Sequence, residues 1–336
     1  MNFTTPYNTT DFFYTKEENA ILFDTEINNT FFTLVVDIKS FAFYSERSTS
    51  KTLRYKVPLF ENKAVFYLGD IIDRSMARIQ EIDLYSLFQY KNAKVTLTIQ
   101  EIDIESNTVL SSNTIGPINF VAGYLPEKVR NNCAFLDMYN LPRRAVENGY
   151  AFVNMILTTG SHTFNVLKNG RKIESFVIDV LSSNICSRSF KLDNYEVIKG
   201  DIFEIQFDAF PDLRKQFRIL PKAMHSNYIA FEDEYLLKSI IECTGDYRFS
   251  LEFTSKMNKI QKKKNEITLK ASSKTDIICT INTGFVLESE ETFIETLQRS
   301  KRAWIIIGQN QGIELVPNNK KMQKFDPETA LYSYDI

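Results

Sequence analysis

The sequence predicts a mainly β protein: three tandem antiparallel β-sandwich-like units, the last of them α+β with one amphipathic helix. The chain has 336 residues, and at this length about two or three domains are expected. Phe and Tyr, which favour strands, number 27 and 16, whereas Gly and Pro number 11 and 9. Apolar and polar residues alternate in several segments, as in half-buried strands, and one segment near the C-terminus has a helical period instead.

The N-terminal part of the chain divides into an expected arm, residues 1–29, and a first sandwich-like domain, residues 30–125. The arm is polar but carries three consecutive aromatic residues, Phe12, Phe13 and Tyr14. Two interpretations are open: a loosely ordered terminus, or an extended arm whose aromatic side chains dock on a neighbouring subunit.

Strands of the first domain are expected at 31–45, 53–60, 64–72 and 94–103. The last of these alternates cleanly, because Val95, Leu97 and Ile99 face one way and the polar residues between them face the other. One short helix is expected within residues 70–88. Residues 115–128 contain two glycines and two prolines, which is typical of a connection between domains.

A second sandwich-like domain is predicted over residues 126–221. The segments 150–159 and 162–180 favour strands, and Asn169-Gly170 is a strong signal for a two-residue hairpin turn. Residues 202–207 alternate again.

The third domain, residues 222–336, contains a predicted long hairpin and the helix. Residues 247–253 place four apolar side chains on one face of a strand, and alternation resumes at 267–271 beyond a lysine-rich tip. The four side chains are those of Tyr247, Phe249, Leu251 and Phe253. The chain is expected to end in strands at 303–307, 312–316 and 331–336.

The helix signal begins at Ser289, a residue type that favours the N-cap. Glu290 and Glu291 put negative charge in the first turn, where the helix dipole favours it. An apolar stripe follows and then an apolar run, Trp304–Ile307, that suits a buried strand. The stripe consists of Phe293, Ile294 and Leu297. A single helix of this kind can cover one face of an antiparallel sheet, so it needs no catalytic purpose.

The residues that usually carry chemistry are sparse. His162 and His225 have no histidine or cysteine nearby at ligand spacing, and the glycine-rich phosphate and nucleophile motifs are absent from the sequence. The acidic run 232–234 could supply a pair of carboxyl groups for glycoside hydrolysis, although solvated acidic loops are more common. We therefore expect no enzyme, no cofactor and no metal site. The cysteines Cys133, Cys186, Cys243 and Cys279 lack C-x-x-C spacing, so free thiols and synthesis in a reducing compartment are expected.

The charge balance also constrains the partners. Forty basic residues oppose 42 acidic ones, for a net charge of −2, which makes nucleic acid an unlikely main partner. The run Lys262, Lys263 and Lys264 is interpreted as the soluble tip of the hairpin, with the alternative that it complements an acidic patch on a protein neighbour. No secretory signal or membrane-spanning run is recognised, so we expect a protein made in the cytoplasm.

The third domain resembles, in the order of its segments, structural tail-module (virion) proteins of bacteriophages infecting Bacteroidetes. In those proteins a strand ending in a Thr-Gly dipeptide leads into an acidic helix and then an apolar strand. Those places are taken here by Thr283-Gly284, Glu288, Glu290, Glu291 and Trp304–Ile307. The run 55–72 is similar to a strand-and-helix step near the start of such proteins, whereas Phe231 stands where they usually have tryptophan. The resemblance implies a virion structural role, with no catalytic residues to transfer.

Three functional hypotheses follow. The first is a non-enzymatic structural subunit of a phage tail or baseplate, which contacts other virion proteins and forms a homo-oligomeric ring. The second is a β protein that binds carbohydrates or cell surfaces, as a receptor-binding part or an adhesin. The third is an enzyme such as a glycoside hydrolase, which would need two facing carboxyl groups in a pocket.

Overall fold

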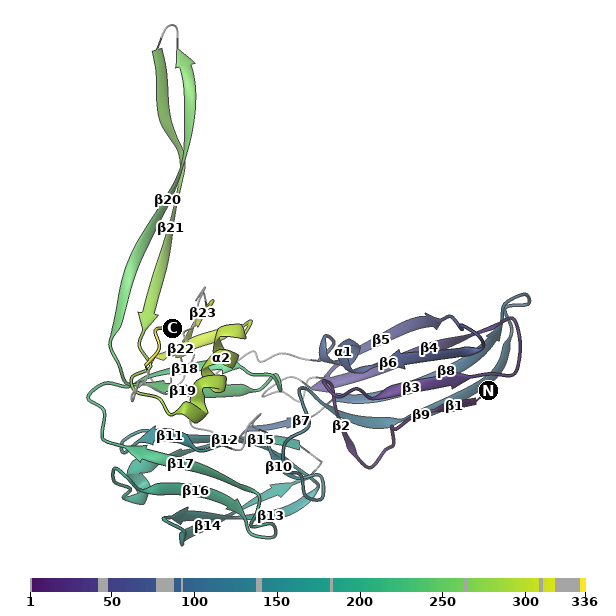
Figure 1. Cartoon of the computed structure of the whole chain (residues 1–336), viewed down its shortest axis with the longest axis horizontal. Coiled ribbons are helices and arrows are strands. Elements are labelled where there is room, and N and C mark those ends of the chain that lie inside the picture. The colour runs from purple at the N-terminus through teal and green to yellow at the C-terminus, as the bar shows by residue number, and fades with distance from the viewer. Residues whose placement is uncertain are drawn as a thin grey trace.

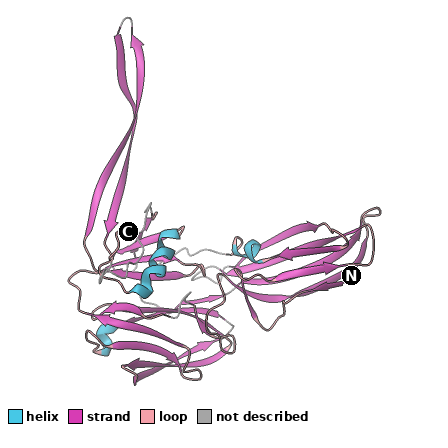
Figure 2. Cartoon of the chain, in the orientation of Figure 1, coloured by secondary structure: helices cyan, strands magenta, loops and turns pink. Residues whose placement is uncertain are grey.

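The structure is a computed structural model and describes residues 2–41, 48–76, 88–91, 93–136, 141–181, 184–262, 265–307, 311–317 and 333–336. Strands make up most of it, with short helices between them (Figure 2). The predicted mainly β class is therefore confirmed. Within the described residues, the strands form five sheets in the body of the molecule and one long two-stranded hairpin (Figure 1).

The first unit is a sandwich of two sheets around one apolar core. One sheet has the order β1-β3-β6 and the other β2-β9-β8-β4-β5. Val95, Leu97 and Ile99 are fully buried on β8, which confirms the alternation predicted for that strand. The elements are β1 (Asn2–Thr4), β2 (Phe12–Tyr14), β3 (Ala20–Asp24), β4 (Thr30–Phe41), β5 (Ser48–Val57), β6 (Lys63–Tyr67), α1 (Gly69–Asp73), β8 (Ala93–Asp103) and β9 (Val109–Val121).

The N-terminal residues differ from the expected arm, because they form part of the first unit. β1 and β3 belong to its smaller sheet, and β2 pairs in parallel with β9. Phe13 packs against the core of the first unit, whereas Phe12 and Tyr14 pack where all three units meet. Tyr14 is 4% exposed. The aromatic side chains therefore dock on their own chain, since strand pairing and burial are both available there.

Residues 115–121 also differ from expectation: they belong to strand β9 and not to a connection. Pro117 has no N–H group to donate to the neighbouring strand, which is why the sequence suggested a break. The strand accommodates it because the pairing of β8 with β9 shifts register between Val95 and Leu97, opposite the cis bond Gly116–Pro117.

The second unit is a further sandwich, with sheet orders β10-β12-β15-β7 and β11-β17-β16-β13-β14. Asn169 and Gly170 form the predicted turn between β13 and β14, with φ angles of 50° and 76° that suit the type I′ geometry. β7 pairs with β15, so a segment within the range expected for the first domain completes a sheet of the second unit. The elements are β7 (Phe88–Lys91), β10 (Ala134–Phe135), β11 (Arg143–Val146), β12 (Tyr150–Leu157), β13 (Gly160–Lys168), β14 (Arg171–Val180), β15 (Asn184–Lys191), η1 (Leu192–Tyr195), β16 (Ile202–Phe207) and β17 (Arg214–Leu220).

The third unit is a four-stranded sheet, β19-β18-β22-β23, with a helix on one face. Ile294 and Leu297 of the helix are fully buried against that face, as the stripe predicted. The other face, which includes Trp304, packs on the β10-β12-β15-β7 sheet of the second unit. The elements are β18 (Asn227–Glu232), β19 (Lys238–Cys243), η2 (Glu288–Glu290), α2 (Glu291–Arg299), β22 (Ala303–Ile307) and β23 (Gln311–Leu315).

This stacking places β12 inside the molecule. Ala151, Val153 and Met155 face the core of the second unit, whereas Phe152 and Ile156 face the third unit. Every residue of β12 after Tyr150 is therefore buried, which explains why the strand is apolar except for Asn154. The amide of Asn154 donates to the carbonyl oxygen of Lys238 at 3.0 Å. The second and third units together form a stack of three sheets and one helix.

A hairpin of strands β20 (Tyr247–Lys262) and β21 (Asn265–Ile281) stands out from the third unit as a long free arm (Figure 1). The closing strand expected at 331–336 is reduced, in the four terminal residues that the structure describes, to a bridge between Asp335 and Asn282. Tyr334 is buried in the core beside α2.

The start of the helix differs from the sequence prediction. Ser289 does not cap α2; it lies in η2, and its hydroxyl donates to the carbonyl oxygen of Pro142 at 2.5 Å. Glu290 stands at the N-cap position of α2, but its side chain caps the preceding η2 by accepting a hydrogen bond from the N–H of Leu287 at 3.1 Å. The serine is engaged by the chain entering β11, a contact between distant segments that a local cap signal cannot reveal.

Candidate interaction surface

The hairpin β20–β21 has one apolar and one polar face. Leu251 lies opposite Ile277, and Phe249 lies opposite Cys279, so side chains of both strands share a face. Phe249 is 63% exposed, Phe253 67% and Ile277 73%. We call this surface the arm face; it consists of Tyr247, Phe249, Leu251, Phe253, Ile277 and Cys279. The opposite face carries polar residues such as Arg248, Glu252 and Thr254.

The arm face is unusual for a protein surface in water. Single exposed apolar residues are normal, but a contiguous row of them marks an interaction site. A two-stranded hairpin is also marginally stable on its own, because it buries little apolar surface. The predicted alternation of Tyr247, Phe249, Leu251 and Phe253 is confirmed, and the structure adds that this face is open to solvent.

The outer half of the hairpin is strongly basic. Residues 256–274 contain seven lysines and one glutamate, a net charge of +6, in a chain whose total is −2. Lys256, Lys270 and Lys274 are exposed. Lys262 is the last residue of β20, and Lys263 and Lys264 lie outside the described residues. The apolar and basic surfaces of the arm thus lie on successive stretches of the same strands.

The root of the hairpin is held by Arg144 of β11, in the second unit. Its guanidinium donates to the carbonyl oxygens of Glu242 at 2.8 Å and Thr283 at 2.7 Å, and to that of Phe285 at 2.5 Å. Glu242 lies near the end of β19, the strand that leads into β20, and the other two acceptors lie just after β21. One side chain therefore fixes both strands where they leave the sheet.

Arg144 is in turn neutralised by Glu290. Its Nε lies 3.2 Å from a carboxylate oxygen of Glu290, and its backbone N–H donates to the other oxygen at 3.1 Å. The two side chains are 3% and 2% exposed. Arg143 acts beside it, donating to the carbonyl of Ile240 at 2.8 Å and stacking on the ring of Phe293 at 3.6 Å.

The structure explains why threonine and glycine stand at positions 283 and 284. Gly284 has a φ of +69°, and a Cβ at this position would lie 2.1 Å from the hydroxyl oxygen of Thr244. Only glycine fits a left-handed backbone at so close an approach. Thr283, fully buried, accepts the N–H of Tyr334 at 2.9 Å and so joins the hairpin root to the C-terminal residues.

An open groove of about 630 Å³ lies at this root. Two exposed aromatic side chains, Tyr247 and Phe285, border it together with polar groups. The polar residues include Asp246, Arg248, Asn282 and Asp335.

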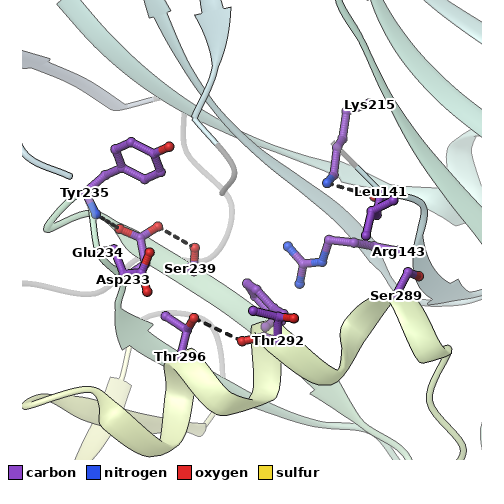
Figure 3. Close-up of a pocket in the computed structure, with 11 residues that line it drawn as sticks. Leu141, Arg143, Lys215, Asp233, Glu234, Tyr235, Ser239, Ser289, Thr292 and Thr296 are labelled. Carbon is purple, nitrogen blue, oxygen red and sulfur yellow. Dashed lines mark hydrogen bonds between the residues drawn. The ribbon is translucent and has the colours of Figure 1, made fainter. Parts of the chain in front are cut away.

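A second, much smaller cavity of about 40 Å³ lies between α2, the β18–β19 turn and β17 (Figure 3). Asp233 accepts hydrogen bonds from the N–H groups of Tyr235 and Leu237 at 2.9 and 3.0 Å, and from the hydroxyl of Ser239 at 2.7 Å. Lys215 donates to the carbonyl of Leu141 at 3.1 Å. Since one water needs roughly 10–15 Å³ of such space, the cavity has room for a few waters.

The three carboxylates of the acidic run 232–234 have different surroundings in the structure. Asp233 shapes the β18–β19 turn, and Glu232 is buried at the end of β18. Burial raises the pKa of the Glu234 carboxyl, with smaller effects from neighbouring charges. Asp233 and Glu234 both line the small cavity, whereas Glu232 is not among its lining residues. The oxygens of Asp233 accept the three hydrogen bonds that hold the turn.

His162 and Cys133, far apart in the sequence, form a pair that the sequence reasoning missed. Burial raises the pKa of the Cys133 thiol, but hydrogen bonds with His162 and Thr158 outweigh it, so the pKa is lowered. The same hydrogen bond raises the pKa of His162. Cys133 is 1% exposed, so we interpret the pair as a buried link between the chain before β10 and strand β13. All four cysteines are free, as predicted.

Within the described parts of the chain, no group of His, Cys, Asp and Glu has the arrangement of a metal site. None of the described helices is long and apolar enough to cross a membrane. No protein-family model matches the chain, and no curated protein matches it either.

Replacing Arg144 with methionine tests the clamp. The change leaves the carboxylate of Glu290 buried without its cation, so we expect the free energy of unfolding to fall by about 3–5 kcal/mol. Hydrogen exchange should also speed up at residues 244–246 and 282–285, on both sides of the hairpin root. Chemical denaturation and exchange mass spectrometry measure the two effects.

Arg299→Met is the matched control, because Arg299 pairs with Glu295 on the exposed face of α2. Exposed pairs of this kind contribute about 0.2–1 kcal/mol. A loss for Arg144→Met no larger than that of the control would contradict the clamp.

The pH dependence of stability tests the environment of Glu242. Burial raises the pKa of this carboxyl above its usual 4.5, against hydrogen bonds from Ser226 and Tyr228 and the charge of Arg144. The folded state therefore binds the proton more tightly than the unfolded state, and this contribution grows as pH falls from 7 and levels off below about 4.5. Glu242→Gln keeps an acceptor for Tyr228 but removes the ionisation.

We expect Glu242→Gln to be more stable than the natural chain at pH 7, by a margin that shrinks toward pH 4.5. Urea denaturation at several pH values measures that margin. A margin that is independent of pH over this range would be incompatible with the raised pKa.

Proposed function

We propose that the protein is a non-enzymatic structural subunit of a phage tail or baseplate, a protein–protein scaffold assembled in the host cytoplasm and carried in the virion. Its partners in this proposal are other virion proteins and further copies of itself in a ring. The observation that carries the proposal is the arm face, an exposed apolar row on a hairpin held rigidly at its root.

The geometry of the arm favours assembly over solubility as a free monomer. Its apolar residues are large and aromatic, the types enriched at the centres of protein interfaces. A projecting strand pair can reach a neighbour without any change in the body that carries it. The clamp by Arg144 keeps the direction of the arm defined, so binding costs little conformational entropy at the root.

The resemblance to phage tail-module proteins supports the same proposal. The segments that carry it surround the hairpin root: Thr283-Gly284 ends the hairpin, Glu290 pairs with Arg144, and Trp304–Ile307 forms the adjoining strand. The positions on which the resemblance rests thus hold the arm in place.

Polar substitution of the arm face tests the proposal. Phe249→Ser, Leu251→Ser and Phe253→Ser together leave the strand pairing intact, because these side chains are exposed. We expect the triple variant to fold but to enter particles at least about tenfold less than the natural chain, since it loses interface anchors. Quantitative mass spectrometry of purified virions, with electron microscopy to place the subunit, measures incorporation.

The matched control changes three residues on the opposite face of the same strand: Arg248→Ser, Glu252→Ser and Thr254→Ser. This variant should enter particles as the natural chain does. Equal incorporation of the two triple variants would remove the arm face as the basis of assembly.

The groove at the hairpin root favours a second candidate function, carbohydrate binding by a receptor-binding part or an adhesin. Tyr247 and Phe285 border it as exposed rings, and polar side chains surround them, as sugar recognition requires. On a glycan array, Phe285→Ala would then lose binding. Phe60→Ala, which removes an exposed ring on the first unit, should not. A natural chain that binds no host surface glycan would exclude this function.

A further inference from the structure

The first unit carries a second exposed apolar surface, on the outer face of its β1-β3-β6 sheet. Leu22 and Val65 are paired across β3 and β6, and Tyr67 lies beside them opposite Ala20. Leu22, Val65 and Tyr67 are 49%, 52% and 58% exposed. We call these three residues the sheet patch. The inner side chains of the same strands, Ile21 and Phe23, are buried in the core.

The arm face and the sheet patch match in two properties: both are apolar faces of paired strands, and the charges beside them are opposite in sign. Both are the outward sides of antiparallel strands, and two such faces pack against each other at about 10 Å in β-sandwiches. The outer half of the arm carries a net charge of +6, so the rest of the chain carries −8 of the total of −2. At the ends of β3 and β6, next to the sheet patch, lie the exposed acidic residues Glu18, Asp24, Glu26 and Glu61, with Lys63 among them.

The two surfaces lie at separate places on one molecule. The arm rises from the third unit, and its strands β20 and β21 point away from the first unit (Figure 1). Tyr247 and the rest of the arm face are anchored at the root by the Arg144 clamp, which fixes the direction of the arm. The arm therefore does not cover the sheet patch of its own molecule.

We infer that the occupant of the arm face is a second copy of this chain: the arm packs on the sheet patch of its neighbour, with the basic outer half beside the acidic strand ends. This inference rests on the proposed scaffold function and names its partner. The contact is heterologous, because different surfaces of the two copies meet. Contacts of this kind form rings when the rotation closes and filaments when it does not.

The test uses the full-length chain and two triple variants. The arm variant has Phe249, Leu251 and Phe253 changed to serine, and the patch variant has Leu22→Ser, Val65→Ser and Tyr67→Ser. Sedimentation velocity should show concentration-dependent assembly of the natural chain and only monomers for each variant alone. An equimolar mixture of the two variants should form a dimer, because one retains an intact patch and the other an intact arm.

Controls separate this result from loss of folding. Hydrogen exchange of the body should match the natural chain in both variants. Ile173→Ser with Val177→Ser changes two exposed apolar residues of β14 and should leave assembly unchanged. Lys256→Glu with Lys270→Glu should weaken assembly at least about tenfold in low salt and less in high salt, because the charges are exposed.

Three outcomes would overturn the inference. A patch variant that assembles like the natural chain would show arm–arm pairing instead. A mixture of variants that stays monomeric would show that the two surfaces do not meet. A natural chain that is monomeric at every concentration, but whose basic arm binds DNA or anionic lipid vesicles, would assign the arm to another partner. None of these results bears on incorporation into virions, which tests the scaffold function separately.

Discussion

The buried pair of Arg144 and Glu290 is the interaction on which the arrangement of the arm depends. Three backbone carbonyls on both sides of the hairpin converge on one guanidinium, and the carboxylate that neutralises it also caps the turn before α2. A buried pair adds little to stability compared with an apolar pair of the same shape, but it is very sensitive to the loss of one partner. The pair joins the second unit, the helix and the hairpin root in one fixed geometry. Its physical role is therefore to set the direction in which the hairpin leaves the third unit.

This direction matters because the hairpin cannot stabilise itself by packing. Beyond its root the two strands have each other and solvent, and large aromatic side chains such as Phe249 and Phe253 remain exposed. Exposed apolar area of this kind is unfavourable in water and becomes favourable when a partner covers it. The hairpin thus holds an exposed apolar surface next to a fixed root, and this is the feature on which the proposed scaffold function rests.

Much of the fold could be predicted from the sequence, because strand formation is largely local. The alternation at 94–103, the Asn169-Gly170 turn and the apolar stripe of α2 all have the predicted structure. The alternation of apolar and polar residues does not show whether the apolar face of a strand is buried in a core, covered by a partner or exposed to solvent. The same period of two describes β8, whose apolar face lies in a core, and the arm face, which lies in solvent. Non-local pairing explains the other differences: β2 pairs with β9, β7 with β15, and Ser289 with Pro142.

Charge is the property that distinguishes the arm from a core strand in the sequence. A dense run of lysines is unfavourable in a core, because each buried charge needs a partner. The arm face instead continues directly into the lysine-rich segment 256–274, so the apolar row and the positive charge must occupy one continuous surface. A surface of that composition matches an apolar patch with acidic margins, and the outer sheet of the first unit is such a patch. In the contact inferred above, the basic arm of one copy lies beside the acidic margin of the next, and repulsion between like-charged arms disfavours arm–arm pairing.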